Sequence, residues 1–289
     1  MVEIDAGVYD GDAAVWAQSD LTIRAVGGVA HVRAGRGLAE GKGIWVIKGP
    51  GVTVESAELS GARSPRRNGS GIRGEGVGLT VRDCRFHDND AGLLAGGGPE
   101  SDIVVERSEF AANGAGDGRS HNIYVVSARS FTLRASASHH TRGGHNVKSR
   151  AHRSAILYNR IMDETDGSAA YGIDLPDGGV AYVIGNLVQK GPRAGNRTLV
   201  AYGAESLGLP RNELYVVNNT LVNDRREGRR LPLAWRKELF VRVWGKPARV
   251  RIVGNLCVGP GLVLKGAGEL ADNLQYRDRG ACAAPAGPR

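Results

Sequence analysis

Short clusters of alternating apolar and polar residues recur along the whole chain. Each cluster keeps this alternation for four to six residues and then stops at Gly, Asn or Asp, which is typical of β-strands with one buried face. No segment keeps an apolar period of 3.6 residues between helix caps, so we expect little helix. The clearest clusters are Val54–Leu59, Val81–Phe86, Val105–Phe110, Leu133–Ser136, Ile156–Ile161, Val183–Val188, Val216–Leu221 and Ile252–Cys257.

The fourth position of these clusters is restricted to small residues and Asn. At spacings of 23 to 36 residues it holds Ala57, Cys84, Ser108, Ser136, Asn159, Asn186, Asn219 and Asn255. Such irregular spacing is typical of solenoid coils whose loops vary in length, and stacked coils bring like residues about 4.8 Å apart. The Asn side chains are then expected to form a ladder that also satisfies backbone groups in the turns.

This repeat predicts an all-β chain, folded as a parallel β-helix with an Asn ladder and loops of variable length. We expect a single domain over residues 1–276 and a tail over residues 277–289. A β-sandwich or a propeller is the alternative, but either would join its strands by hairpins and would not keep Asn at one position. The 43 Gly among 289 residues agree with many turns that need a positive φ.

The composition excludes several classes of protein. A hydrophobic share of 41% argues against disorder, and the Gly residues lack the period of three that collagen needs. No run approaches the roughly 18 apolar residues of a membrane span. The three cysteines are too few for a metal cluster or a disulfide framework, which leaves one Cys257–Cys282 bridge as the alternative to free thiols, with Cys84 unpaired.

The net charge of +8 favours an acidic partner, namely nucleic acid, anionic lipid or an acidic polysaccharide. Eight Lys and Arg residues occur within 225–246 together with Trp235 and Trp244, and such a mixture suits an acidic glycan. Nucleic acid ranks lower, because these cations occupy one loop rather than a stripe. We therefore expect an acidic polysaccharide or oligosaccharide as partner, no membrane partner and a monomeric protein.

The Asn-anchored coils resemble the right-handed parallel β-helix of the pectate-lyase-like superfamily, over about residues 2–275. The opening Val2–Tyr9 resembles the first coil of that superfamily, written GD-x-(I/V)-x-(I/V)-x-x-G-x-Y. This resemblance implies the fold and not the reaction, because the superfamily includes lyases, hydrolases, epimerases, esterases and adhesins. The chain opens as the middle of a strand, so we expect that a signal segment was trimmed and that the protein is periplasmic or secreted.

The densest set of chemically active side chains lies between residues 117 and 176. Three segments there, 117–124, 142–150 and 171–176, each precede an apolar cluster. Their central residues Ile123, Val147 and Ile173 lie about ten residues before Leu133, Ile156 and Val183, so we assign the segments to the same strand on three successive coils. With Ile123, Val147 and Ile173 inward, alternation places one outward row. That row is Tyr124, Lys148 and Asp174. A slip of one residue would bury Lys148 without a partner.

The same register defines three neighbouring rows. They are Asn122, Asn146 and Gly172, also outward; Val126, Arg150 and Pro176 beside them; and His121, His145 and Tyr171 at the entry edge of the strand. The combined patch would gather cations, imidazoles, tyrosines, amides and a carboxylate within about 10 Å. Such a patch suits a carboxylated sugar.

Lys148 is the candidate base, provided that neighbouring cations favour its neutral form. Arg150 and Asn146 would hold the uronate carboxylate, and Asp174 would orient Lys148. The candidates for proton return to the departing oxygen are His121, Tyr124 and His145. Further candidates for substrate binding are Asn122, Tyr171, Tyr202 and Arg142. These roles predict β-elimination of an acidic polysaccharide, the reaction of a polysaccharide lyase.

The Val147-Lys148-Ser149 strand resembles the "VKS" strand of the β-helix lyases that degrade alginate and chondroitin. The resemblance implies that Lys148 is the base. Members of that family complete the site with an Arg-His pair on the following coil. In this chain the following coil carries Tyr171–Asp174 instead, so we expect Arg150 to take the role of the arginine.

Other functions remain open at this point. A glycoside hydrolase needs a second carboxylate near Asp174, which Asp117, Asp177 or Glu205 could supply by loop folding. A C5-epimerase and a non-catalytic glycan-binding solenoid are further alternatives.

Each candidate residue also has a purely structural alternative. Asn122 and Asn146 would form another ladder, His121 and His145 would satisfy turns, and Lys148–Asp174 would be a surface ion pair. The run 163–166, Asp-Glu-Thr-Asp, offers oxygen ligands for Ca²⁺, although a solvated acidic loop is favoured. No cofactor is assigned with certainty.

Overall fold

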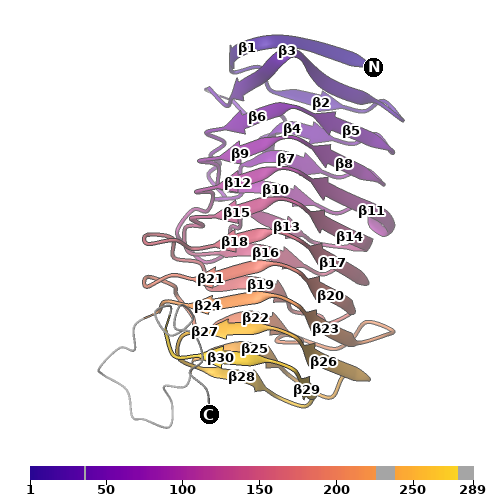
Figure 1. Cartoon of the computed structure of the whole chain (residues 1–289). Helices are drawn as coiled ribbons and strands as arrows, with labels where there is room; N and C mark the ends of the chain where they lie inside the picture. The colour runs from indigo at the N-terminus through magenta and orange to yellow at the C-terminus, as the bar shows by residue number, and fades with distance from the viewer. Residues whose placement is uncertain (36, 226–237, 279–289) are drawn as a thin grey trace.

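The computed structural model describes residues 1–35, 37–225 and 238–278. These residues form thirty strands in two sheets whose strand pairings are parallel, and none of them forms a helix long and apolar enough to cross a membrane. The strands stack from the N-terminus to the C-terminus as successive coils (Figure 1). The predicted all-β parallel β-helix is therefore confirmed.

The ten-stranded sheet takes one strand from every coil. In order these are β2 (Ala14–Trp16), β4 (Gly43–Ile47), β7 (Ser70–Gly74), β10 (Ala91–Ala95), β13 (Ile123–Val125), β16 (His145–Ser149), β19 (Tyr171–Leu175), β22 (Thr198–Tyr202), β25 (Leu239–Val243) and β28 (Leu262–Lys265).

The twenty-stranded sheet is folded over a bend and forms two walls. Its first wall contains β1 (Val2–Asp10), β3 (Thr22–Arg33), β5 (Val52–Glu55), β8 (Leu79–Arg82), β11 (Gly98–Glu106), β14 (Ala128–Arg134), β17 (Arg153–Leu157), β20 (Val180–Ile184), β23 (Glu213–Val217), β26 (Arg249–Val253) and β29 (Glu269–Ala271). Its second wall contains β6 (Ala57–Ser60), β9 (Arg85–His87), β12 (Glu109–Ala111), β15 (Ala137–His139), β18 (Arg160–Met162), β21 (Leu187–Lys190), β24 (Thr220–Asn223), β27 (Leu256–Val258) and β30 (Leu274–Tyr276). Strand β3 is long enough to pair with both β5 and β6.

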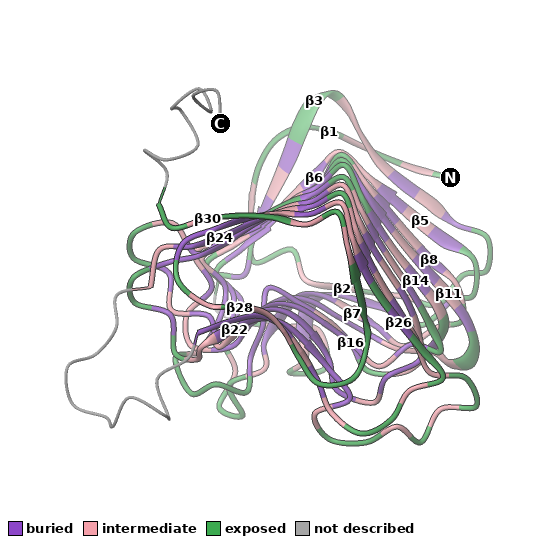
Figure 2. Cartoon of the chain, turned by 60° about the horizontal axis from the view of Figure 1, so that its bottom comes forward, coloured by how far each residue is buried: buried purple, intermediate pink, exposed green. Residues whose placement is uncertain are grey.

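The core lies between these three walls (Figure 2). Paired strands bring like residues into register, so the apolar side chains form continuous rows. One row of the ten-stranded sheet is Ile72, Leu93, Ile123, Val147, Ile173, Val200 and Val241, all of them buried. Facing it from the first wall is the row Ile23, Val54, Val81, Val105, Leu133, Ile156, Val183, Val216 and Ile252. A coil removed from the stack would expose both rows, which is why no coil is stable alone.

The apolar clusters predicted as single strands are in fact pairs of strands that meet at the bend. Val81–Phe86, for example, spans β8 and β9, and Asp83 between them has a φ of 54°. The residue before every fourth-position residue has a positive φ, between 47° and 67°. The restricted fourth position therefore marks a corner of the coil rather than the middle of a strand.

The predicted Asn ladder runs along this corner through Asn159, Asn186, Asn219, Asn255 and Asn273. Each side-chain amide donates to the Oδ1 of the next Asn over 2.9–3.0 Å. The same oxygen accepts the backbone N–H of the preceding Asn at 2.9–3.0 Å. The ladder thus satisfies backbone donors that the sharp bend leaves outside the sheet.

Serine hydroxyls continue the ladder toward the N-terminus. The Ser136 backbone N–H donates to Asn159 Oδ1 at 2.9 Å, and the Ser108 N–H donates to the Ser136 hydroxyl at 3.1 Å. The Cys84 N–H in turn donates to the Ser108 hydroxyl at 3.1 Å. The thiols of Cys84 and Cys257 are free and buried, while Cys282 lies outside the described residues.

Replacing Asn219 with Ala tests the ladder. The substitution leaves the Asn186 backbone N–H and the Val183 carbonyl without their side-chain partners in the core. Since a buried unsatisfied group costs about 1–3 kcal/mol, we expect the free energy of unfolding to fall by about 3 kcal/mol or more, measured by urea denaturation.

Asn219→Ser is the matched control, because Ser108 and Ser136 accept backbone N–H groups at equivalent corners. It is expected to lose less stability than Asn219→Ala. Equal losses in the two variants would contradict the role assigned to the ladder oxygen.

Candidate functional site

The outward face of the ten-stranded sheet carries the predicted row of chemically active side chains. In the observed register Tyr124 pairs with Lys148 and Lys148 with Asp174, while Ile123, Val147 and Ile173 pair on the inward side. The predicted register of β13, β16 and β19 is therefore confirmed. It brings together residues that are 24 and 26 positions apart in the chain.

Lys148 and Asp174 form a buried ion pair rather than the surface pair considered from the sequence. Lys148 Nζ lies 3.5 Å from Asp174 Oδ2, and the two side chains are only 11% and 3% exposed. His145 Nε2 lies 3.4 Å from the same oxygen. The other oxygen, Oδ1, is buried without a hydrogen bond. Burial raises the pKa of Asp174 to about 6, although Lys148 acts in the opposite direction, so this carboxyl can carry a proton at mildly acidic pH.

The loop between β22 and β23 brings a second carboxylate to Lys148. Glu205 Oε1 lies 3.4 Å from Lys148 Nζ, and Glu205 Oε2 lies 2.5 Å from Arg150 Nη2. The Glu205 backbone N–H donates to the Pro176 carbonyl at 2.9 Å, which fixes the loop against the end of β19. The hydrogen bond from Arg150 lowers the pKa of Glu205. The pKa values of the two carboxyl groups are therefore shifted in opposite directions, that of Asp174 upward and that of Glu205 downward.

Arg150 is held by three side chains of the protein itself. Besides Glu205, its guanidinium donates to Asp177 Oδ1 at 2.7 Å and to the Tyr124 hydroxyl at 2.9 Å. Tyr124 also lies against Lys148, whose Nζ is 5.3 Å from the centre of the ring. Arg150 thus fixes the second carboxylate and the tyrosine hydroxyl in one network.

The two histidines at the entry edge form a stack with Tyr171. The rings of His121 and His145 lie 4.7 Å apart, and those of His145 and Tyr171 lie 5.0 Å apart. His121 Nδ1 accepts the His145 backbone N–H, and His145 Nδ1 accepts the Tyr171 N–H. Burial, with Lys148 adding to it, lowers the pKa of His121 to about 3, and burial lowers that of His145 well below 6.5. Both rings are neutral, and the proton of His145 on Nε2 faces Asp174.

The prediction that Asn122 and Asn146 point outward to bind substrate is wrong. Both are fully buried and belong to a second amide ladder, in which each side chain donates to the next. Its members are Asn89, Asn113, Asn122, Asn146 and Asp163. Gly172 continues their row, and a Cβ there would lie 3.0 Å from a methyl of Val188, so the row faces the interior. Alternation fails at this corner between the walls, where buried carbonyls such as that of Phe110 need donors.

Tyr202 and Arg142, also predicted to bind substrate, have other partners in the structure. Tyr202 does not line a subsite, because its ring points into the core opposite Leu175 and its hydroxyl donates to the Gly179 carbonyl at 2.5 Å. Arg142 pairs with Asp88, which follows β9, and is thereby directed to an earlier coil.

The acidic run 163–166 does not converge on one point. Asp163 is buried at the end of the second ladder and accepts the Gly191 backbone N–H. Glu164 pairs with Arg160, and Asp166 pairs with His140 at 3.2 Å. The three carboxylates therefore have separate partners and do not form the oxygen cage that Ca²⁺ requires.

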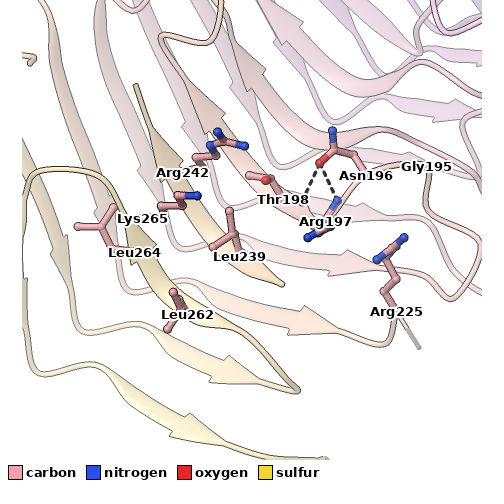
Figure 3. Close-up of a pocket in the computed structure, with 10 residues that line it drawn as sticks. All are labelled: Gly195, Asn196, Arg197, Thr198, Arg225, Leu239, Arg242, Leu262, Leu264 and Lys265. Atoms are coloured by element: carbon pink, nitrogen blue, oxygen red, sulfur yellow. Dashed lines mark hydrogen bonds between the residues drawn. The ribbon is translucent and has the colours of Figure 1, made fainter. Parts of the chain in front are cut away.

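The row of Lys148 and Asp174 continues along the sheet into a basic pocket. The next residues in register are Ala201, Arg242 and Lys265. Of these three, Arg242 and Lys265 border a cavity of about 900 Å³ (Figure 3). Its lining residues are Gly195, Asn196, Arg197, Thr198, Arg225, Leu239, Arg242, Leu262, Leu264 and Lys265. Four of these ten side chains are cationic, so the pocket suits an anionic ligand.

Tyr171 lies close to both the pocket and Asp174, since Asp174, Arg242 and Asn196 all influence the pKa of its hydroxyl. Burial raises the pKa of the Tyr171 hydroxyl, while Arg242 and a hydrogen bond with Asn196 act in the opposite direction. The sequence had drawn attention to Arg225 and Arg242 but not to Arg197 or Lys265, although extending the register by three coils finds Lys265. The other basic residues of the 225–246 segment that lie within 226–237, and Trp235, are outside the described residues.

Comparison with protein families matches residues 19–221 to the right-handed β-helix region. No curated protein matches the chain in sequence. The matched segment covers more than half of the chain and contains Tyr124, Lys148, Asp174 and Glu205. Together with the parallel coils of both sheets, this match shows that the chain belongs to the right-handed β-helix family.

Proposed function

We propose that the protein hydrolyses an acidic polysaccharide on the outward face of its ten-stranded sheet. The observation that carries the proposal is the pair of carboxylates, Asp174 and Glu205, that contact one ammonium group, that of Lys148. The substrate class comes from the basic pocket beside them. β-Elimination, which the sequence favoured, is kept as the second candidate.

The carboxylate pair lies within the upper limit of separation for hydrolysis, and the pKa values of its two groups are shifted in the directions that hydrolysis needs. Both groups contact Lys148 Nζ, at 3.5 and 3.4 Å, so their contacting oxygens are no more than about 7 Å apart. Glycoside hydrolases place their two carboxyl groups about 5–9.5 Å apart. Burial lets Asp174 serve as the general acid, and Arg150 keeps Glu205 ionised for the role of base or nucleophile.

The basic pocket supports an acidic sugar polymer as the substrate. Arg242 lies two coils beyond Asp174 in the same outward row, a distance of about 10 Å along the stack. Lys265 lies one coil further. A chain lying along the coils would place uronate or other anionic groups on these cations while a glycosidic bond meets Asp174 and Glu205.

β-Elimination with Lys148 as base is supported by a different observation. The Tyr124 hydroxyl lies 2.9 Å from Arg150 Nε, and Lys148 lies over the same tyrosine ring, so two proton carriers adjoin a guanidinium. Lys148 Nζ is already engaged by two carboxylates, Asp174 at 3.5 Å and Glu205 at 3.4 Å, which opposes a role as base for the substrate. Elimination therefore requires that Glu205 first move away, and we rank it second.

Product analysis on a panel of uronate-containing polysaccharides separates the two reactions. Hydrolysis adds water and creates no chromophore, whereas elimination leaves an unsaturated sugar that absorbs in the ultraviolet. We expect new reducing ends without that absorbance. Since general acid–base groups contribute about 10²–10⁴-fold, Asp174→Asn and Glu205→Gln are each expected to lower kcat by that factor.

Glu269→Gln is the matched control, because Glu269 is an exposed partner of Arg251 on the other sheet. An ultraviolet-absorbing product that disappears in Lys148→Met and Tyr124→Phe would establish elimination instead. Binding to the panel without any product would identify a non-catalytic glycan-binding solenoid, and an altered uronate configuration at unchanged chain length would identify an epimerase.

The raised pKa of Asp174 predicts two pH effects. The activity should fall as pH rises through about 6, because the general acid loses its proton. Between pH 3.8, the ordinary carboxyl pKa, and about pH 6, Asp174 holds a proton in the folded protein that it has released in the unfolded chain. The free energy of unfolding therefore falls as pH rises through this range. Relative to Asp174→Asn, the free energy of unfolding of the wild type should fall by on the order of 2 kcal/mol across this window.

Urea denaturation at several pH values measures this difference, with the exposed Asp10→Asn variant as a control. A constant difference between wild type and Asp174→Asn from pH 4 to pH 7 would refute the proton on Asp174.

Removing cations from the basic pocket should weaken substrate binding without removing catalysis. The Arg242→Ala and Lys265→Ala variants are each expected to raise KM for an acidic oligosaccharide about tenfold, with kcat changed little, since neither side chain touches the carboxylate pair. Arg251→Ala, on the other sheet, is the control. A large loss of kcat at unchanged KM would place these two residues in the chemistry instead of in binding.

A further inference from the structure

A second cluster of potential ligands lies on the twenty-stranded sheet, near the N-terminal end of the stack. His31 of β3, Glu58 of β6 and His87 of β9 come from three successive coils. One ligand atom from each lies within 4.8 Å of the other two, and no other group of three such residues in the described ranges meets this condition. Their side chains are 23%, 18% and 20% exposed, so an ion from solvent can reach them.

The donor atoms suit a divalent transition metal. Glu58 Oε1 lies 2.8 Å from His87 Nε2 and 3.9 Å from His31 Nε2. With Zn²⁺ bonds of about 2.0–2.2 Å, tetrahedral ligands lie roughly 3.4 Å apart, and the two distances fall on either side of that value. Two imidazole nitrogens and one carboxylate oxygen form a donor set that Zn²⁺ uses with an open fourth position.

Neighbouring side chains hold the ligands of the cluster in position, as is usual around protein metal sites. His87 Nδ1 lies 2.9 Å from Asp88 Oδ2, an arrangement in which a carboxylate orients the imidazole and leaves Nε2 free to bind metal. Asp88 is itself held by Arg142. On the other side, the Ser60 hydroxyl lies 2.8 Å from His31 Nε2, and this hydrogen bond has to be given up when His31 Nε2 binds the ion.

One cation competes for Glu58 but has an alternative partner. Arg85 Nη1 lies 3.4 Å from Glu58 Oε1, while Arg85 Nε lies 3.1 Å from Glu109 Oε2. Arg85 can therefore keep Glu109 when Glu58 turns to a metal ion. The cluster does not depend on Arg85 for its charge balance.

We infer that His31, Glu58 and His87 form a Zn²⁺ site that links three successive coils at the N-terminal end of the β-helix. The ion binds the folded stack and not the separated coils, so it stabilises the fold by mass action. The site lies on a different sheet from Lys148 and Asp174, and the proposal does not rest on the proposed hydrolysis.

The test uses the full chain, stripped of metal with EDTA and without an affinity tag. Titration calorimetry with ZnCl₂ is expected to show one site per chain. Excess Zn²⁺, at roughly a hundred times its Kd, is expected to raise Tm by several degrees, whereas MgCl₂ has no effect. His87→Ala and Glu58→Gln should abolish both responses.

Asp88→Asn should weaken Zn²⁺ binding about 10- to 100-fold, because the carboxylate that orients the His87 imidazole is lost. His139→Ala is the matched control, since His139 pairs with Glu109 at 3.0 Å on the same wall; its Zn²⁺ response should equal that of the wild type. Because His87 is partly exposed, its variant should fold, which circular dichroism in EDTA checks. If the wild type shows no zinc-dependent heat or Tm change, or if His87→Ala keeps them, the site does not exist.

Discussion

Parallel stacking of the coils is the constraint on which the rest of this structure depends. Each coil leaves apolar rows and backbone groups unsatisfied until the next coil covers them. The corners are the critical points, because the residue before each ladder position has a positive φ and its neighbours cannot all pair within the sheet. The Asn159–Asn273 ladder and its serine extension supply the missing acceptors at one corner. The Asn89–Asp163 ladder does so at another, where its oxygens accept backbone N–H groups.

The same stacking creates the candidate site. Tyr124, Lys148 and Asp174 are far apart in sequence and adjacent in space because they hold one position on successive coils. The face is not open along its whole length, since the loop that carries Glu205 covers Lys148. Burial of Asp174 raises its pKa to about 6, and the nearby Glu205 carboxylate adds to this shift. Two and three coils beyond Asp174, the row carries Arg242 and Lys265, so the carboxylate pair and the basic pocket lie along one line of the sheet.

The cations nearest to Asp174 are not free to bind a ligand, although the residue types of the site suggest that they would be. Lys148 and Arg150 are the obvious groups for an acidic substrate, but Asp174, Asp177 and Glu205 already bind them. The cations that border a pocket are instead Arg197, Arg225, Arg242 and Lys265. The cations of the candidate site therefore fall into two sets, one paired with carboxylates of the protein and one that lines the pocket.

The sequence by itself determined the architecture, the Asn ladder and the register of β13, β16 and β19, because stacked coils repeat one pattern of apolar and corner residues. It did not determine which way Asn122 and Asn146 point, since alternation ends at that corner and buried carbonyls there attract amide donors. Tyr202 does follow alternation, two residues after the inward Val200, so extending the register by one coil places its ring in the core. Nor did the sequence determine that Glu205 is the second carboxylate, because a loop of variable length has no repeat from which its fold can be inferred. Only the tertiary structure decided these contacts, through the packing of that loop on Pro176 and through the charges that burial brought together.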